Sequence, residues 1–502
     1  MPRYRRLARQ YLGKYASVLL VKALPRLEAS NKLQPGLVLL ANLARAIPID
    51  EFHRLQLEKV REAFRNNHPA VKLVRRTILR THPKCLSTIF RNLWLPWFIN
   101  DDIRADFRDR EGFDPPTLAV ISPLKECNLK CTGCYASAVA PNKAERLDFN
   151  TLDRIVTELQ SFGTNFIVFS GGEPTHPLIW NDIKAICTKH NDLAFMMYTN
   201  GTLIDDAKVR DLREIGNMLP SISIEGWQAE TDGRRGSGVY ARVMDAMDRL
   251  RGAGIPFGYS LTYTSSNFKV ATDPAFVDHL MDKGCIFGWY FMYVPVGKDP
   301  DLSLVVTPEQ RDKIRQFTWD MFREKGLFIA DFWNSGPICQ GCIAGGRYLH
   351  VNNKGDIEPC VFFKFSDHNV RDSRLIDALR SRFFSEIRKA QGSHKNPLMP
   401  CQFMDHPEDG RHAVEVSGVR ASEEGGEAIF SERIFPYLES LSNEYRHRYA
   451  DHAWIESGDY ASLDWAYGEP RWLAPGPGPS RHLGREPAAA EPEFHQRFEH
   501  QT

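Results

Sequence analysis

The chain has 502 residues, 42% of them hydrophobic and 25% charged, a globular composition that excludes disordered and fibrous classes. The net charge is only +1, yet residues 1–110 hold 22 Lys and Arg against 9 Asp and Glu. This basic excess predicts either contact with an anionic surface, such as membrane headgroups, or a solvated basic face. Of the anionic partners, nucleic acid is not expected.

No stretch reaches the roughly 18 uninterrupted apolar residues that a membrane-spanning helix needs. The first apolar stretch is interrupted by Lys22 and no small-residue cleavage site follows, so a secretory signal is not expected. Ten cysteines are too few for a disulfide scaffold, and seven of them fall in two groups. The sequence predicts a cytoplasmic protein, either free or peripheral to the membrane.

Residues 1–110 are predicted to form a basic helical extension, because apolar residues recur three and four positions apart. Within it, residues 11–24 place apolar side chains among Lys14 and Lys22. This pattern is typical of a helix lying in a membrane interface, and equally of a helix packed on a catalytic domain.

Residues 111–328 alternate short apolar runs with helical periods, which predicts parallel strands joined by right-handed crossovers. A helix is expected after the cap residue Asn150, and another after Thr307, with Pro308 at its first position and Gln310 completing a capping box. The fold class is therefore α/β, with six units forming an incomplete barrel. The six predicted strands are 118–121, 166–169, 194–198, 222–224, 257–263 and 287–294.

The alternation ends after residue 328. Residues 329–410 are rich in cysteine and glycine and are predicted to form a small separate module. Residues 411–467 are expected to be a helical segment. Residues 468–502 open on a Pro- and Gly-rich stretch with little apolar surface to offset the entropy of ordering, which predicts a disordered tail.

Three cysteines, Cys127, Cys131 and Cys134, directly follow the first predicted strand. A structural zinc site needs four protein ligands, and no nearby Cys or His completes such a set. An iron–sulfur cube with three cysteine ligands leaves one iron open to an outside molecule. The spacing therefore favours a [4Fe-4S] cluster over zinc.

A second motif follows the next predicted strand. Gly171, Gly172 and Glu173, followed by a proline, lie where glycine allows the backbone to approach a ligand closely. Such a turn is weak evidence by itself, but it gains weight from the cysteines one strand earlier.

Over residues 117–296 the sequence resembles the radical S-adenosylmethionine (SAM) superfamily, which has this cysteine spacing and this glycine turn. The resemblance implies a partial (β/α)6 barrel, a fold related to the TIM barrel. It also implies that SAM binds the open iron of a [4Fe-4S] cluster and is reductively cleaved. The resulting 5′-deoxyadenosyl radical would abstract hydrogen from a substrate, with electrons supplied by a reductant such as ferredoxin or flavodoxin.

The resemblance also implies roles for individual residues. Gly171, Gly172 and Glu173 would hold the amino group of SAM, and Tyr135 would lie beside its adenine. The positions of Ser223 and Glu225 match those that contact the ribose hydroxyls. Arg235 would bind the SAM carboxylate, which a planar guanidinium suits, unless it forms a surface ion pair.

The second cysteine group consists of Cys339, Cys342, Cys360 and Cys401. The stretch between Cys342 and Cys360 resembles the start of the SPASM or twitch extension of radical SAM enzymes, which binds auxiliary clusters. Four thiols allow at most one further cluster. A structural zinc site, or a cluster with three ligands and an open iron, are the alternatives.

The remaining cysteines, Cys85, Cys187 and Cys285, lie in apolar contexts and are expected to be core residues. The substrate is predicted to be a lipid-like or anionic small molecule, and an aromatic run at 287–293 suits an apolar group. The alternatives are a peptide-modifying SPASM-type maturase, an iron–sulfur electron carrier that does not cleave SAM, and a zinc-stabilised adaptor.

Overall fold

The computed structural model describes residues 23–24, 26–27, 30, 32–44, 58, 60–66, 68–94, 101–136, 145–297, 300–339 and 341–455. The predicted tail at 468–502 lies outside these residues, as does nearly all of the predicted amphipathic helix at 11–24. Among the described residues, no helix has the length and apolar character needed to cross a membrane.

A curved sheet of nine strands forms the centre of the molecule, in the order β7-β6-β5-β4-β3-β2-β1-β8-β9. Neighbouring strands from β7 to β8 run parallel, and β9 pairs with β8 in the antiparallel sense. The strands are β1 (Leu118–Ile121), β2 (Phe166–Phe169), β3 (Ala194–Thr199), β4 (Met218–Ser223), β5 (Gly258–Tyr263), β6 (Phe287–Met292), β7 (Phe328–Asp331), β8 (Tyr348–Val351) and β9 (Ile357–Glu358). The fold is the expected α/β partial barrel.

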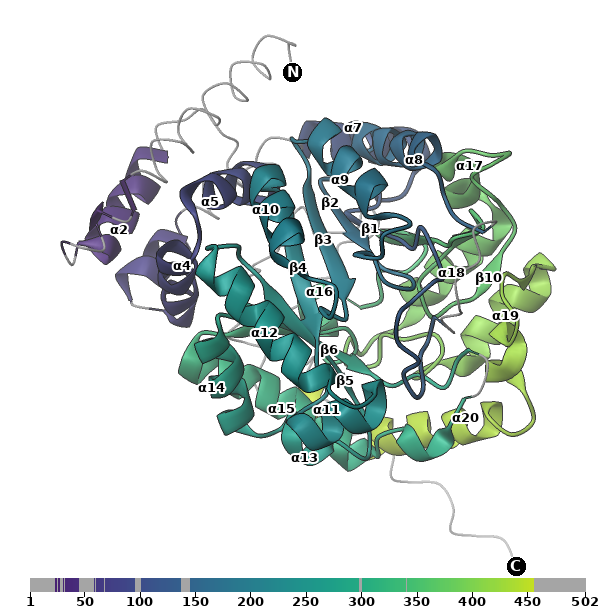
Figure 1. Cartoon of the computed structure of the whole chain (residues 1–502). Helices are drawn as coiled ribbons and strands as arrows, with labels where there is room; N and C mark the ends of the chain where they lie inside the picture. Colours follow the sequence, from purple (N-terminus) through teal and green to yellow (C-terminus); the bar gives the residue numbers. More distant parts are fainter. Residues whose placement is uncertain are drawn as a thin grey trace, which may run out of the picture.

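Helices cover the outer face of this sheet (Figure 1). They are α8 (Phe149–Ser161), α9 (Trp180–Lys189), α10 (Asp206–Ile215), α11 (Gln228–Arg235), α12 (Val239–Gly252), α13 (Phe268–Ala271), α14 (Pro274–Lys283) and α15 (Pro308–Lys325), with a short turn η2 (Leu302–Leu304). Side chains alternate across the strands, so Val120 and Val168 line the inner face, which we call the lumen, while Ile121 and Phe169 pack on the helices.

Most barrel elements match their predicted positions. β1 and β2 have the predicted bounds, and α15 has the predicted capping box, with Thr307 accepting from the Gln310 amide. The fourth strand was predicted too short, because Pro220 and Ser221 interrupt its apolar run. The cap of α8 is Asp148, which accepts from Thr151, and the prediction of Asn150 is wrong.

Three strands beyond the predicted six extend the sheet. β7 adds to β6, so the predicted module boundary at 328/329 falls inside a barrel strand. β8 pairs with β1 along its full length, and β9 follows by a tight turn. The cysteine-rich region is thus joined to the barrel through the sheet itself.

The remaining elements of the C-terminal region lie beside the barrel, with α18 and α19 on the side away from α2 and α4 (Figure 1). They are α16 (Gly336–Cys339), β10 (Phe365–Ser366), α17 (Leu375–Arg380), α18 (Arg382–Ser393), α19 (Pro407–Ser417), β11 (Arg420–Ala421), η3 (Gly426–Phe430), α20 (Phe435–Tyr445), η4 (Arg446–Ala450) and α21 (Asp451–Ile455). Strands β10 and β11 pair with each other. The described part of 411–467 is mainly helical, in line with its prediction.

The N-terminal extension contains α2 (Leu33–Ala44), α4 (Pro69–Arg80), α5 (Pro83–Ile89), η1 (Phe90–Trp94) and α7 (Asp101–Glu111). Its basic side chains bind carbonyls at the C-terminal ends of barrel helices. Lys72 donates to Glu324 O (2.7 Å) and Arg76 to Lys325 O (2.8 Å) at the end of α15. Arg80 donates to Met281 O at the end of α14, and Lys84 donates to Glu214 O at the end of α10.

Cations at helix C-termini are stabilising, because the last carbonyls lack intrahelical donors. In the described part of the extension, basic residues therefore hold helices onto the barrel. Contact with an anionic surface stays a prediction.

Replacing Arg76 with methionine is expected to lower the free energy of unfolding by about 1 kcal/mol, because the end of α15 loses a charged donor. Urea denaturation at neutral pH would measure the change. Arg210→Met, at an exposed position on α10, is the control and is expected to change stability by less than about 0.5 kcal/mol. Equal effects of the two substitutions would contradict this account of the extension.

Candidate functional site

The first cysteine group lies on the loop that follows β1, at the carboxyl end of the barrel strands. All three sulfurs belong to partly buried residues. Burial, reinforced by the nearby Glu173 carboxylate, raises the pKa of Cys127 to about 12. Burial also raises the pKa of Cys131, against the lowering effect of Arg235. Unliganded thiols here are therefore held neutral, and a bound cationic cluster would be needed to stabilise them as thiolates.

The end of α11 holds this loop in place. Arg234 donates through Nε to Thr132 O (3.1 Å), and the Thr132 amide donates to Arg234 O (3.0 Å). Gly133 adopts a left-handed φ of 65°, and a Cβ added there would lie 2.9 Å from the Tyr293 ring. Glycine is thus required at this position between two of the cysteines.

Asn200, at the end of β3, contacts the same loop. Its side-chain amide lies 3.6 Å from the Cys127 sulfur and 2.9 Å from Asn128 Oδ1. The amide oxygen accepts from the Thr202 amide, which fixes the orientation of the side chain. The sequence could not distinguish a turn role from a ligand-site role for Asn200, and the structure gives it both contacts. An amide aimed at a ligand sulfur is a device that tunes metal sites.

The spacing of the sulfurs discriminates between metals. Tetrahedral zinc, with Zn–S bonds of about 2.3 Å, brings its sulfur ligands to about 3.8 Å from one another. Over the described residues, which include all ten cysteines, no three thiols have their sulfurs all within 4.8 Å of one another. A four-iron cube holds its thiolates farther apart than a single ion does, so a spacing wider than that of a zinc site is compatible with a cluster.

The glycine turn packs directly against the cysteine loop. A Cβ at Gly172 would lie 1.9 Å from Glu126 O, and one at Gly171 would lie 2.4 Å from Leu124 O. The amides of Gly172 and Glu173 donate to these same two carbonyls, at 2.9 and 2.8 Å. Only glycine permits this close contact between the two segments.

The Glu173 carboxylate is buried and already surrounded by donors. Oε1 accepts from the Thr175 amide (2.9 Å) and from the hydroxyls of Thr175 and Thr199 (2.5 Å each). Oε2 accepts from the Asn200 amide at 2.8 Å. This side chain therefore ties the end of β2 to the end of β3, which positions the turn.

The other predicted SAM contacts lie around the same rim. Tyr135 hydrogen-bonds Ser170 at 2.6 Å, and its ring lies 5.5 Å from that of Phe362. Ser223 lies 3.2 Å from Ser260 on the adjacent strand. The structure thus brings Tyr135 and Ser223 to the carboxyl ends of the strands, and their contacts with SAM stay predictions.

Glu225 and two arginines form a buried charged cluster beside Cys131. Glu225 Oε1 lies 2.8 Å from Arg234 Nη1 and 2.8 Å from Arg235 Nε. Burial alone raises the pKa of Glu225, but the two guanidinium groups outweigh it, so that this pKa is lowered. Arg235 thus forms an ion pair, as its alternative role foresaw, but this pair is buried within the site and does not lie at the surface. Contact between Arg235 and the SAM carboxylate stays a prediction. The other oxygen, Oε2, is buried without a hydrogen-bond partner among the described residues.

This lowered pKa has a consequence for acid stability. A carboxyl group whose folded pKa lies below its unfolded value of about 4.3 stabilises the fold above that value, and this stabilisation is lost as pH falls through the folded pKa. Glu225→Gln is therefore expected to flatten the acid side of the stability profile, measured by urea denaturation between pH 7 and 3. Glu214→Gln, whose side chain is 73% exposed, serves as the control. A profile for Glu225→Gln as steep as the wild type would contradict the assignment.

In the second cysteine group, three of the four thiols influence one another's pKa. Burial raises the pKa of Cys342 to about 11 and that of Cys401 to about 12. Burial also raises the pKa of Cys360, and charge on Cys342 and Cys401 raises it further, so these three thiols act on one another. The pKa of Cys339 is raised by burial and lowered by Arg347, with no contribution from another cysteine.

Backbone amides point at the sulfurs in both groups. In four cases the sulfur accepts a hydrogen bond from the backbone amide two positions later in the sequence, at 3.3 to 3.5 Å. These cysteines are Cys127, Cys342, Cys360 and Cys401. By contrast, Cys85, Cys187 and Cys285 are buried at 0 to 1% exposure, as expected for core residues. Amide donors stabilise thiolate charge, which a ligand carries and a core thiol does not.

One other group of ligand-type side chains occurs in the described residues, His394, His406 and Asp409. The rings of His394 and His406 are stacked with centroids 3.6 Å apart, and His394 pairs with Asp409 at 2.7 Å. Arg446 lies 3.4 Å from Nδ1 of His406, where its positive charge opposes a metal ion. This group is better described as a hydrogen-bonded brace for α19.

A buried polar network, not foreseen from the sequence, lies between the two cysteine groups. His350 on β8 bonds Ser122 through Nε2 (2.8 Å) and Glu358 through Nδ1 (2.6 Å). A carboxylate only accepts, so Nδ1 carries a proton and donates it to Glu358. Lys364 follows, 3.9 Å from Glu358. The available signal was a lysine flanked by aromatic residues on both sides in the run 362–365.

The comparison with known proteins agrees with this geometry. A family model described as the radical SAM superfamily matches residues 121–279, which include the cysteine loop, the glycine turn and α11. This region of the chain is a radical SAM domain. Such a domain implies a [4Fe-4S] cluster and SAM as cofactors. The prediction of an enzyme is confirmed, and the electron-carrier and zinc-adaptor alternatives are dropped.

Two relatives illustrate the range of the radical SAM proteins similar to this chain. The AdoMet-dependent heme synthase of Nitratidesulfovibrio vulgaris is 24% identical over 321 residues, covering 57% of this chain and 86% of that protein. The PqqA peptide cyclase of Methylobacterium nodulans is 22% identical over 286 residues, covering 51% and 73%. Among solved structures, Streptococcus suis SuiB bound to S-adenosylmethionine matches with a TM-score of 0.51 at 18% identity, covering 71% of this chain and 89% of SuiB. That likeness supports the fold.

Proposed function

We propose that this radical SAM enzyme removes a hydrogen atom from a flat, largely apolar substrate of the tetrapyrrole class, held in the barrel lumen. The observation that carries the proposal is the set of aromatic side chains facing the lumen. The names of several similar proteins, heme synthases among them, point to the same class of substrate.

The aromatic set comes from strands β6 and β3, which are separated in the sheet by β5 and β4, and from the loop after β7. On β6, Trp289 and Phe291 alternate with fully packed residues and are half-buried. Phe291 lies 5.2 Å from Tyr198 on β3 and 5.2 Å from Phe332 after β7, and Trp289 lies 5.4 Å from Phe332. The interplanar angles are 12° between Trp289 and Phe291, 27° between Phe291 and Phe332, and 37° between Trp289 and Phe332. Parallel rings present a flat apolar wall.

The residues at the rim fit SAM and its cluster. Cys127, Cys131 and Cys134 would bind three irons, and the bound cluster with SAM would supply the 5′-deoxyadenosyl radical. Gly171 and Gly172 would let the backbone approach the methionine part, with Glu173 positioning the turn from behind. Glu225 Oε2, a buried acceptor without a donor, suits a ribose hydroxyl. Tyr135 would lie beside adenine, and Ser223 beside the ribose.

The proposal extends to a second cluster. Cys342, Cys360 and Cys401 would hold it, with Cys339 as the fourth ligand. Their spacing, like that of the first group, exceeds what a single zinc ion requires. An iron–sulfur cluster is therefore favoured over structural zinc in the second group.

The test uses anaerobically reconstituted enzyme with SAM, dithionite and iron coproporphyrin III as the tetrapyrrole probe. We expect 5′-deoxyadenosine together with a change in the mass of the tetrapyrrole. Trp289→Ala is expected to reduce tetrapyrrole conversion at least about tenfold while SAM cleavage without substrate is retained. Quenching of tryptophan fluorescence by the probe gives a binding readout. SAM cleavage without binding or conversion of any tetrapyrrole would contradict the proposed substrate class.

A peptide is the second candidate, because a peptide cyclase and the sporulation killing factor maturation protein SkfB of Bacillus subtilis are among the similar proteins. Comparing the metabolites and peptides of the native host with those of a host carrying Cys131→Ala separates the two classes. A peptide whose mass changes only with the active enzyme would favour the maturase. Ferredoxin or flavodoxin is the proposed physiological reductant in either case.

A further inference from the structure

Lys364 is a buried ammonium group that lies at long range from both of its carboxylate neighbours. Its side chain is 4% exposed, and Nζ lies 3.5 Å from Glu423 Oε1 and 3.9 Å from Glu358 Oε2. Close ion pairs with hydrogen bonds have separations of about 2.7–2.9 Å, so this cation is held loosely.

Each carboxylate has closer partners of its own. Glu358 bonds His350 at 2.6 Å and Asn352 at 3.2 Å, and also accepts from Ser422. Glu423 pairs with Lys125 at 3.2 Å. Burying an ammonium costs free energy, and these long separations suit a lysine whose charge also serves another role.

The position of Lys364 between the two cysteine groups indicates that role. Four residues earlier, Cys360 lies in the same tight turn, closed by the Phe363 amide donating to Cys360 O (3.1 Å). On the other side, Nζ lies 5.8 Å from the ring centroid of Tyr135, which directly follows Cys134. Burial lowers the pKa of Lys364, but Glu358 and Glu423 outweigh it and hold this pKa above its ordinary value, so the side chain is charged.

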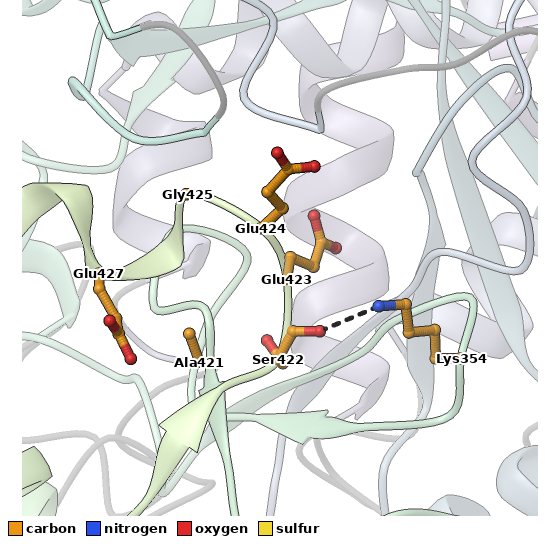
Figure 2. A pocket seen from close by; sticks show the side chains of 7 residues that line it. All are labelled: Lys354, Ala421, Ser422, Glu423, Glu424, Gly425 and Glu427. Carbon is orange, nitrogen blue, oxygen red and sulfur yellow. Dashed lines mark hydrogen bonds between the residues drawn. The ribbon is translucent and has the colours of Figure 1, made fainter.

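Solvent reaches the outer side of this network through a pocket of about 390 Å³ (Figure 2). Ser422 and Glu423 line it, together with Lys354, whose Nζ lies 3.4 Å from Ser422 O. Water there screens the charge of Lys354. Lys364 lies behind this wall, where the lower dielectric lets a charge act over a longer distance.

We propose that Lys364 is a buried cation shared by the two iron–sulfur sites, raising the reduction potential of both. The inference rests on the proposed function, because it requires a cluster at each cysteine group. An added electron makes a cluster more negative, and a nearby unscreened positive charge favours that state. The cation would make both clusters easier to reduce by one donor.

The experiment is a redox titration of the reconstituted holoenzyme, with each cluster followed by electron paramagnetic resonance. Lys364→Met is expected to shift both midpoint potentials to more negative values, with the larger shift at the cluster of the second cysteine group. Lys364→Arg should restore the wild-type values. Glu423→Gln, which removes a negative charge from the same network, should shift the potentials in the opposite direction. Lys354→Met, the matched lysine at the pocket, should leave them unchanged.

The outcomes separate this inference from the proposed function. About eight iron atoms per chain are expected for two clusters. Full iron content with potentials unchanged in both Lys364→Met and Glu423→Gln would overturn the inference alone. A wild-type chain that binds only about four irons would overturn the second cluster, and the shared cation with it. If Lys364→Met does not fold, the opposite shift in Glu423→Gln still decides the question.

Discussion

Replacing Cys131 with alanine is expected to lower 5′-deoxyadenosine formation at least about a thousandfold, equivalent to about 4 kcal/mol of transition-state stabilisation. Cys131 is the middle cysteine of a loop that α11 and Asn200 hold in place, so two remaining thiols cannot retain a cluster with one open iron. Iron content, the spectrum of the reduced cluster and the yield of 5′-deoxyadenosine are the measurements.

Cys85→Ala is the matched control for this substitution. Cys85 is buried on α5, away from both cysteine groups, and its loss should leave a small cavity without changing iron binding. A Cys131→Ala protein that keeps its full iron content and still cleaves SAM would contradict the assigned ligand set. A similar iron loss in Cys85→Ala would show that the effect is a general loss of folding.

Gly172→Ala is expected to have the next largest effect. The added Cβ would meet Glu126 O at 1.9 Å and the carbonyl carbon of Lys125 at 2.7 Å, both of them backbone atoms that cannot rotate away. The turn must therefore move from the cysteine loop, with the loss of the hydrogen bonds that join the two segments. We expect destabilisation of about 1–3 kcal/mol and a loss of SAM cleavage on the order of a hundredfold.

Gly252→Ala, at the end of α12, is the control, because nothing lies within 4 Å of a Cβ at that position. Thermal unfolding and isothermal titration of SAM into the reconstituted enzyme would measure the two effects separately. Unchanged SAM affinity in Gly172→Ala would contradict the role given to the turn. Equal destabilisation in both variants would mean that the backbone around Gly172 moves away from the added Cβ without a loss of stability.

The sequence predicts the barrel well where one local rule decides the structure. Apolar runs bounded by polar residues placed β1 and β2, and a capping box placed the start of α15. The same reasoning failed for β4, where Pro220 and Ser221 are accommodated by pairing with β3 and β5. It also missed β8, because a four-residue strand within a glycine-rich region has too little periodicity to detect.

The candidate site was predictable to the extent that it is local in sequence. Cys127 through Tyr135 and the glycine turn are short motifs with fixed spacing. The contacts of His350 with Ser122, and of Lys364 with Tyr135, join residues more than 200 positions apart. No rule based on neighbouring residues reveals such pairs. Likewise, the engagement of Arg235 by Glu225 depends on where α11 packs.

The pairing of β8 with β1 has a consequence for how the two cysteine groups communicate. Cys127 follows β1, while Cys342 and Cys360 flank the β8–β9 hairpin, so hydrogen-bonded neighbours carry both groups. Their separation is set by strand spacing, and no hinge lies along that route. Electron passage between them would then proceed at a rate insensitive to solvent viscosity, unlike that of enzymes whose redox partners sit on swinging domains.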